Sequence, residues 1–108
     1  MSRNVRCGLI QATNVLGPNH SLEKIKKAMI DKHLKLIEQA AKKKVQILCL
    51  QEIFYGPYFC AEQNARWYEM TEPVPDGPTI KLMQKVAAKH RRSATIAAAI
   101  SAGIVRPG

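Results

Sequence analysis

The sequence has few cysteines and no long apolar run, and each shortage excludes a class of protein. Its three cysteines, Cys7, Cys49 and Cys60, are an odd number and form no C-x-x-C pair, which argues against a disulfide scaffold, a zinc site or a redox couple. The longest weakly polar stretch, residues 94–105, is shorter than the roughly 18 apolar residues that a membrane-spanning helix needs. The first residues contain no apolar segment long enough for a secretory signal. We therefore expect a cytoplasmic protein that does not enter a membrane.

Acidic residues are missing from the last third of the chain. Residues 77–108 contain six Lys and Arg and no Asp or Glu, whereas residues 1–76 contain eleven bases and all eight acids. The net charge of +9 raises the question of a nucleic acid or an anionic membrane surface as partner. No recognisable nucleic-acid-binding motif accompanies this charge. Binding of nucleic acid through the tail and the helix lysines therefore stays a weaker alternative.

The 108 residues, 46% of them hydrophobic, predict one globular domain with a modest core. Residues 5–11 form a short apolar run typical of a buried strand. Residues 21–44 have helical periodicity, and Ser21 is placed to cap the helix. Residues 45–50 are nearly continuously apolar, which favours a strand covered on both faces. The order strand, helix, strand predicts a βαβ unit of an α/β fold.

The helix over residues 21–44 has one apolar and one charged side. At about 100° per residue, one broad arc gathers Leu22, Ile25, Met29, Ile30, His33, Leu34, Leu36, Ile37, Ala40 and Ala41. The opposite arc carries Lys24, Lys27, Asp31, Lys32, Lys35, Glu38 and Lys42. We expect the apolar arc to pack on the sheet and the charged arc to face solvent.

Beyond the second strand the chain becomes aromatic and rich in turns. Residues 53–60 predict a structured loop, and a short helical stretch follows at residues 64–70. Residues 72–79 predict a turn that leads into a second helix with Pro78 in its first turn. Its expected buried face consists of Ile80, Met83, Val86, Ala87 and His90.

Gln51 and Glu52 stand directly after the second strand, where a βαβ unit places its functional groups. Burial of a carboxyl group at this point would raise its pKa toward the range of a general base. The alternative is a strand-end glutamate that hydrogen-bonds the following turn. From the residues alone, both interpretations of Glu52 stay open: a general base, and a strand-end residue that hydrogen-bonds the following turn.

Three sequence segments resemble the nitrilase superfamily of carbon-nitrogen hydrolases. They are ILCLQEIFYGPYFC at residues 47–60, CGLIQ at residues 7–11 and EPVPDGPT at residues 72–79. The most similar branch is that of the N-carbamoyl amino acid amidohydrolases, which includes β-ureidopropionase. The resemblance implies an α-β-β-α sandwich and a Glu, Lys, Cys triad, and it assigns the catalytic glutamate to Glu52.

In this family the cysteine attacks the carbamoyl or amide carbon, and a base and an oxyanion-stabilising cation assist it. The family's lysine and cysteine motifs do not occur among the 108 residues, and Cys60 does not occupy the nucleophile position. We therefore expect the amino-terminal portion of such an enzyme, inactive by itself and without a cofactor. Its substrate, if completed, would be a small N-carbamoyl amino acid or amide, and homo-oligomers are possible assemblies.

The last residues depart from the family pattern. Five of the ten residues at 93–102 are alanine, a composition that favours helix over strand. We therefore divide the chain into a partial hydrolase domain at 1–90 and a divergent, Ala-rich basic tail at 91–108, the result of a frameshift, truncation or design. Half a sandwich exposes a sheet face. The rival hypothesis is thus an inactive interaction module that self-associates through that face.

The other conspicuous residues have plain structural interpretations. Cys7 and Cys49 are expected as small core residues of the strands. The three histidines, at positions 20, 33 and 90, share no ligand spacing with one another or with a cysteine, so no metal site is expected. Trp67, Tyr68 and Met70 are expected to serve in packing.

Overall fold

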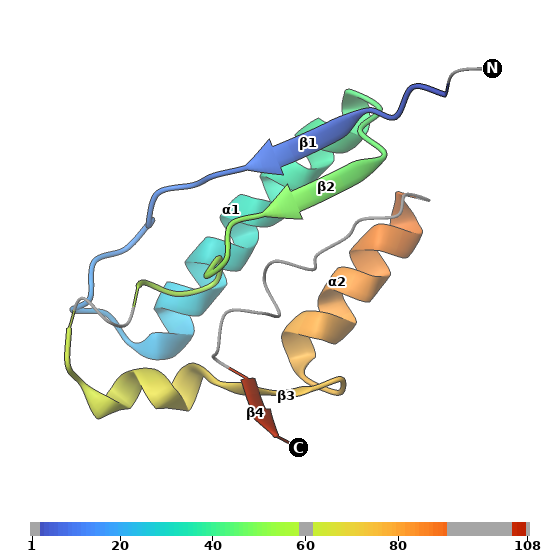
Figure 1. Ribbon diagram of the computed structural model, residues 1–108. Helices are drawn as coiled ribbons and strands as arrows, with labels where there is room; N and C mark the ends of the chain where they lie inside the picture. The colour runs from blue at the N-terminus through green and yellow to red at the C-terminus, as the bar shows by residue number, and fades with distance from the viewer. Residues whose placement is uncertain (1–2, 59–61, 91–104, 108) are drawn as a thin grey trace.

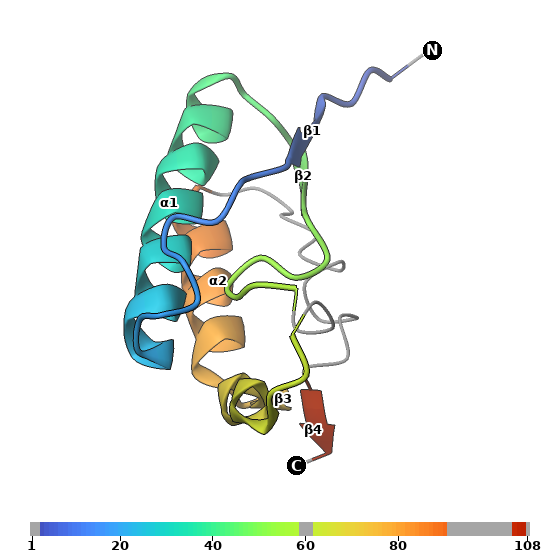
Figure 2. The same cartoon turned by 90° about the vertical axis from the view of Figure 1, so that its left-hand side faces the viewer.

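The computed structural model describes residues 3–58, 62–90 and 105–107. Their elements, in chain order, are β1 (Cys7–Ile10), α1 (Leu22–Lys42), β2 (Ile47–Leu50), the 3₁₀ helix η2 (Ala65–Met70), β3 (Glu72–Val74), α2 (Pro78–Lys89) and β4 (Val105–Pro107). Both helices lie on the same side of the β1–β2 ribbon (Figures 1 and 2). The predicted mixed α/β architecture is confirmed. The second sheet of an α-β-β-α sandwich stays a prediction.

The predicted βαβ unit forms the first half of the structure. β1 and β2 pair in parallel, from Cys7 opposite Ile47 to Ile10 opposite Leu50. Gly8 lies where the strands are closely covered, because a Cβ there would lie 3.1 Å from side-chain atoms of both Leu48 and Val45. The parallel pairing brings the carboxyl ends of both strands to one edge.

Local signals at both ends explain the length of α1. Ser21 caps the helix, and its Oγ accepts a hydrogen bond from the Lys24 amide at 3.3 Å. The helix ends at Lys42, and Lys44 takes a left-handed conformation with φ of 59° that turns the chain toward β2. The buried residues of α1 are Ile25, Met29, His33 and Ile37, all on the predicted apolar arc.

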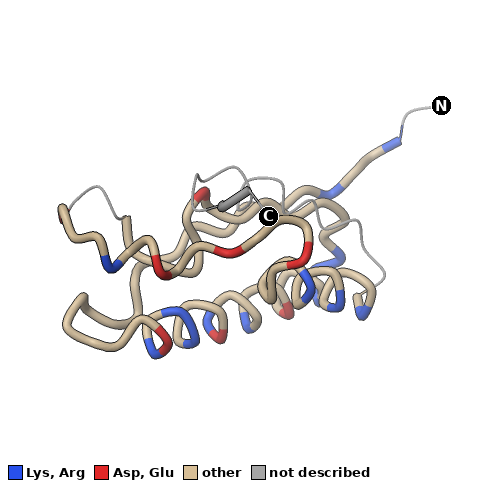
Figure 3. The backbone as a smooth tube through the Cα atoms, turned by 90° about the horizontal axis from the view of Figure 1, so that it is seen from below, with Lys and Arg blue, Asp and Glu red and all other residues tan. Residues whose placement is uncertain are grey.

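The charged arc of α1 is the predicted solvent face. Figure 3 shows basic and acidic residues interspersed along the helical part of the tube. Lys27 donates to Asp31 at 2.8 Å one turn later, an exposed i,i+4 pair. Within the described part of the chain, no helix is long and apolar enough to cross a membrane.

In the second half of the structure, the chain runs from β3 through a turn into α2. Pro78 is in the first turn of α2, as predicted, and Met83 is buried on its inner face. The preceding Gly77 is required by crowding, because a Cβ there would lie 2.6 Å from the Pro73 carbonyl oxygen. The predicted turn at residues 72–79 is corrected at its start, because Glu72–Val74 form the strand β3, which pairs in parallel with β4 and places Glu72 opposite Val105. The predicted composition-based helix at 93–102 lies outside the described residues.

The core lies between the helices and the inner face of β1–β2. Its largest fully buried side chains are Phe54, Met29 and His33. Trp67 and Met70 of η2 join it, as expected for packing residues, whereas Tyr68 is exposed. Tyr68 is thus a correction to the prediction, because it faces away from the side of η2 that packs on the core.

The opposite face of the two strands, which we call the outer face, consists of Cys7, Leu9, Ile47 and Cys49. Leu9 is 84% exposed and Ile47 39% exposed. The predictions of a doubly covered second strand and of a buried Cys7 are therefore wrong for this structure. The reason is that successive strand residues point to opposite faces, and both helices pack on only one of them.

Candidate functional site

An open cleft of about 540 Å³ lies at the carboxyl ends of β1 and β2. Its first wall is residues 12–14, which follow β1, and its second wall is residues 51–53, which follow β2. Gly56 and Tyr58 complete the lining. This is the edge at which the βαβ pattern predicted functional groups.

Gln51 connects the two walls. Its Oε1 accepts a hydrogen bond from the Ala12 amide at 2.6 Å, and its Nε2 donates to the Ile53 carbonyl at 3.1 Å. Sequence reasoning placed Gln51 at this edge without a role. The structure shows that its side-chain amide holds the chain segments after β1 and β2 together.

Glu52 lines the cleft and is exposed. The expectation that this carboxylate is desolvated is therefore wrong for the described structure. The apolar strand ends at Leu50, and the next buried side chains are Phe54 and Tyr55, so the core closes on both sides of Glu52 and leaves it at the opening. The carboxylate is thus accessible to a ligand in the cleft.

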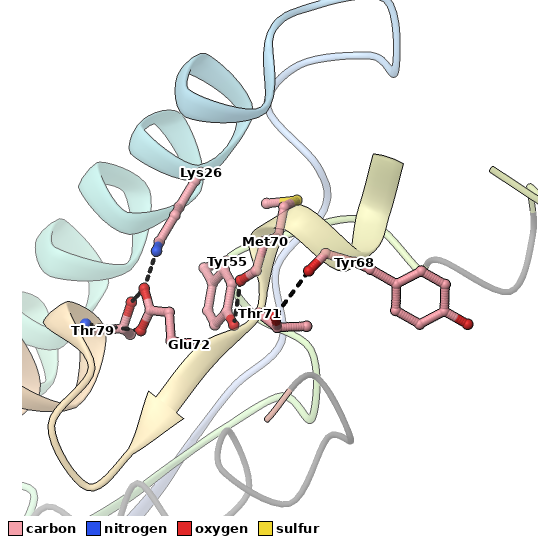
Figure 4. Close-up of polar contacts among 7 residues, drawn as sticks. All are labelled: Lys26, Tyr55, Tyr68, Met70, Thr71, Glu72 and Thr79. Atoms are coloured by element: carbon pink, nitrogen blue, oxygen red, sulfur yellow. Dashed lines mark hydrogen bonds and ion pairs between the residues drawn. The ribbon is translucent and has the colours of Figure 1, made fainter. Parts of the chain in front are cut away.

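The aromatic loop after Glu52 has two different faces. Phe54 and Tyr55 are buried beneath the cleft, whereas Gly56 and Tyr58 line it. The Tyr55 hydroxyl donates to the Met70 carbonyl at 3.1 Å (Figure 4). Burial raises the pKa of the Tyr55 hydroxyl. The prediction of a structured loop is confirmed for residues 53–58, whose aromatic side chains divide between core and site, and residues 59 and 60 lie outside the described residues.

A buried polar cluster joins α1, β3 and α2 below this loop (Figure 4). The Glu72 carboxylate accepts from the Thr79 amide at 3.0 Å and from the Thr79 hydroxyl at 2.7 Å, and it forms an ion pair with Lys26. The Lys26 ammonium also lies 5.0 Å from the centre of the Tyr55 ring. Burial lowers the pKa of Lys26.

None of the three residues Lys26, Glu72 and Thr79 lines the cleft. The hydrogen bonds and the ion pair of this cluster therefore hold α1, β3 and α2 together. Sequence reasoning missed it, although the spacing of seven residues between Glu72 and Thr79 across a Pro- and Gly-rich turn was a usable signal.

Among the described residues, no cysteine or histidine lines the cleft with Glu52. Cys7 is exposed on the outer face, Cys49 is half-buried, and neither lines the cleft. Cys60 lies outside the described residues. His20 is exposed, His33 is fully buried and His90 is half-buried. The described ranges contain no group of three His, Cys, Asp or Glu residues able to hold a metal.

Sequence comparison defines the class of protein. Residues 9–102 match the carbon-nitrogen hydrolase family, so the chain belongs to that family. The resemblance to the nitrilase superfamily, amino-terminal portion, is thereby confirmed. The match runs past residue 90, and the division of the chain at that residue stays a prediction.

Two relatives illustrate the similarity. β-Ureidopropionase of Arabidopsis thaliana is 36% identical over 88 residues, which are 82% of this chain and 21% of the relative. N-carbamoylputrescine amidase of Oryza sativa subsp. japonica is 38% identical over 58 residues, 54% of this chain and 19% of the relative. The chain thus spans about a fifth of the length of these relatives.

Proposed function

We propose that this chain supplies the catalytic base, Glu52, of a carbon-nitrogen hydrolase that acts on N-carbamoyl amino acids or amines. The observation that carries the proposal is the position of Glu52 in the cleft where β1 and β2 end. Membership of the carbon-nitrogen hydrolase family supports the reaction class. The names of the two relatives support an N-carbamoyl substrate.

The chemistry assigns a defined role to an accessible carboxylate. Glu52 would accept the proton of a cysteine thiol as its sulfur attacks the carbamoyl carbon, and the tetrahedral oxyanion would be stabilised by a lysine. Collapse of that intermediate expels an amine or ammonia, which takes a proton, and water then hydrolyses the acyl-enzyme. Cys7 and Cys49 do not line the cleft. We therefore expect both the lysine and the nucleophile from segments beyond residue 108, and no activity from the 108 residues alone.

A chimera tests the assignment of Glu52. Residues 1–90 would replace the corresponding segment of the Arabidopsis β-ureidopropionase, and release of ammonia from N-carbamoyl-β-alanine and from N-carbamoylputrescine would be followed. Glu52→Gln should lower kcat by about 10²–10⁴-fold, the usual contribution of a general base. Glu69→Gln, which changes an exposed glutamate outside the cleft, is the matched control and should leave kcat within about twofold of the parent. Near-normal turnover by a folded Glu52→Gln chimera would exclude the assignment.

A second function is favoured by the outer face. The chain would then be an inactive interaction module that self-associates through the exposed Leu9 and Ile47 of this face. Purified 108-residue protein should then release no ammonia from N-carbamoyl-β-alanine. Measurable release that Glu52→Ala abolishes would refute the module and establish the chain as an enzyme by itself.

A further inference from the structure

His33 is the fully buried polar residue of α1, and it packs against the loop that carries Glu52. Its exposed fraction is 0%, and its ring lies 5.1 Å from the Phe54 ring in an edge-to-face arrangement. Phe54 is itself 1% exposed and follows Glu52 by two residues. The contact therefore places a titratable group against the loop that continues from the second wall of the cleft.

The surroundings of His33 favour the neutral imidazole. Nδ1 lies 2.8 Å from the Met29 carbonyl oxygen, which can only accept, so Nδ1 carries the proton. Nε2 is buried and has no hydrogen-bond partner among the described residues. Protonation would place an N–H group and a positive charge at Nε2 where nothing described accepts the proton, a costly state in an apolar surrounding.

The charged groups on the surrounding elements do not compensate that charge. On α1, Lys32 is adjacent and repels it, and Lys26 is already paired with Glu72 of β3. On the loop, Glu52 is exposed toward the cleft. No ion pair to His33 occurs within the described ranges. Burial accordingly lowers the pKa of His33, and Lys32 lowers it further, although the bond to Met29 acts in the opposite direction.

We propose that His33 is a positioning residue for the Glu52 loop, and that it holds this loop in place only while its imidazole is neutral. The adjacent Lys32 shows that this turn of α1 already supports the site, because its ammonium donates to the Thr13 carbonyl of the first wall at 2.8 Å. Successive residues of one helix thus contact the first wall, through Lys32, and the loop that follows the second wall, through His33. The consequence for catalysis rests on the proposed function of Glu52, whereas the support of the loop does not.

Hydrogen-exchange mass spectrometry of the 108-residue chain tests the proposal without a substrate. Protection factors, corrected for the intrinsic pH dependence of exchange, would be measured for peptides over residues 51–57 from pH 7.5 to pH 5. An open loop restores the ordinary histidine pKa, so loop protection should fall by up to about tenfold per pH unit below about 6.5 until the lowered pKa is reached. Peptides from the middle of α1 should keep their protection over the same range.

Three variants assign the response to a single imidazole. His33→Leu keeps an apolar side chain against Phe54, and its loop protection should no longer change between pH 7.5 and pH 5. His20→Gln and His90→Gln remove the other two imidazoles and should leave the tenfold response intact. An unchanged response in His33→Leu, its loss in either control, a flat profile in the wild type, or a parallel fall in α1 would each overturn the proposal.

A second measurement serves if His33→Leu does not fold. NMR of the wild-type chain with labelled histidine Cε1 should show one imidazole whose titration midpoint lies below the pH at which loop protection begins to fall. A midpoint of the His33 imidazole at or above that pH would overturn the proposal. A failure here leaves the Glu52→Gln result in the chimera unaffected, and a failure of that variant leaves the exchange result unaffected, so the two proposals are tested separately.

Discussion

The Lys32 ammonium donates to the Thr13 carbonyl at 2.8 Å and to the Thr13 hydroxyl at 3.1 Å. This contact joins the middle of α1 to the first wall of the cleft, 19 residues earlier in the chain. The wall has no secondary structure of its own, so its position depends on this contact and on the hydrogen bond that the Ala12 amide donates to Gln51.

Because the hydrogen bonds of Lys32 to the described residues go to the first wall, its replacement should have a small effect on stability and a local effect on that wall. Lys32→Met keeps the aliphatic stem and removes the donor, and it should lower the free energy of unfolding by less than about 1 kcal/mol because the pair is solvent-accessible. Exchange of the amides at residues 12–14 should nevertheless increase. Lys35→Met, on the exposed arc of the same helix, is the control. Equal exchange in the two variants would contradict a role for Lys32 in the wall.

The cluster around Glu72 predicts a much larger effect. Glu72→Gln removes the charge that pairs with Lys26 and leaves a half-buried ammonium without its partner, so we expect a loss of about 2–4 kcal/mol in urea unfolding. The control is Asp31→Asn, which breaks the exposed pair with Lys27 and should cost at most about 0.5 kcal/mol. Similar costs for both variants would show that the cluster does not hold α1, β3 and α2 together.

Two glycines provide a matched test of the turn before α2. Gly77→Ala would place a Cβ 2.6 Å from the Pro73 carbonyl oxygen, backbone that cannot move without disturbing β3, and should destabilise by about 1–3 kcal/mol. Gly17→Ala meets nothing within 4 Å and should change stability by no more than about 0.5 kcal/mol. A tolerated alanine at residue 77 would contradict the packing of this turn.

The outer face predicts self-association that a single charge relieves. Leu9→Glu changes the most exposed apolar side chain of this face and should raise the monomer fraction in sedimentation velocity, with no loss of folding stability. Tyr68→Ser changes another exposed apolar side chain, 72% exposed and on η2, and is the control. If both variants associate as the wild type does, the outer face is not the associating surface.

The positions of the elements could be predicted from the sequence because their signals are local. Ser21 and Pro78 mark helix starts by their own side-chain chemistry, and the periodicity of α1 identified its inner face, including His33. The parallel pairing of the strands followed from the βαβ order. Glu52 was found at the correct edge for the same reason, and by the resemblance to a family.

Exposure could not be predicted in the same way. An apolar strand has the same sequence whether one face or both faces are covered, so Cys7, Leu9 and Ile47 gave no sign that the helices would pack on the other side. The same applies to Glu52, whose exposure depends on where Phe54 and Tyr55 enter the core.

The sequence by itself thus determined the order, type and approximate bounds of β1, α1, β2 and α2, the family, and the strand edge that carries the candidate base, whereas the short strands β3 and β4 were not predicted. Only the tertiary structure decided which polar groups meet. Glu72 pairs with Lys26 across 46 residues, and His33 meets Phe54 across a strand and a turn. These contacts depend on how the helices pack on the sheet, because side chains distant in the chain become neighbours only once the backbone has brought their elements together.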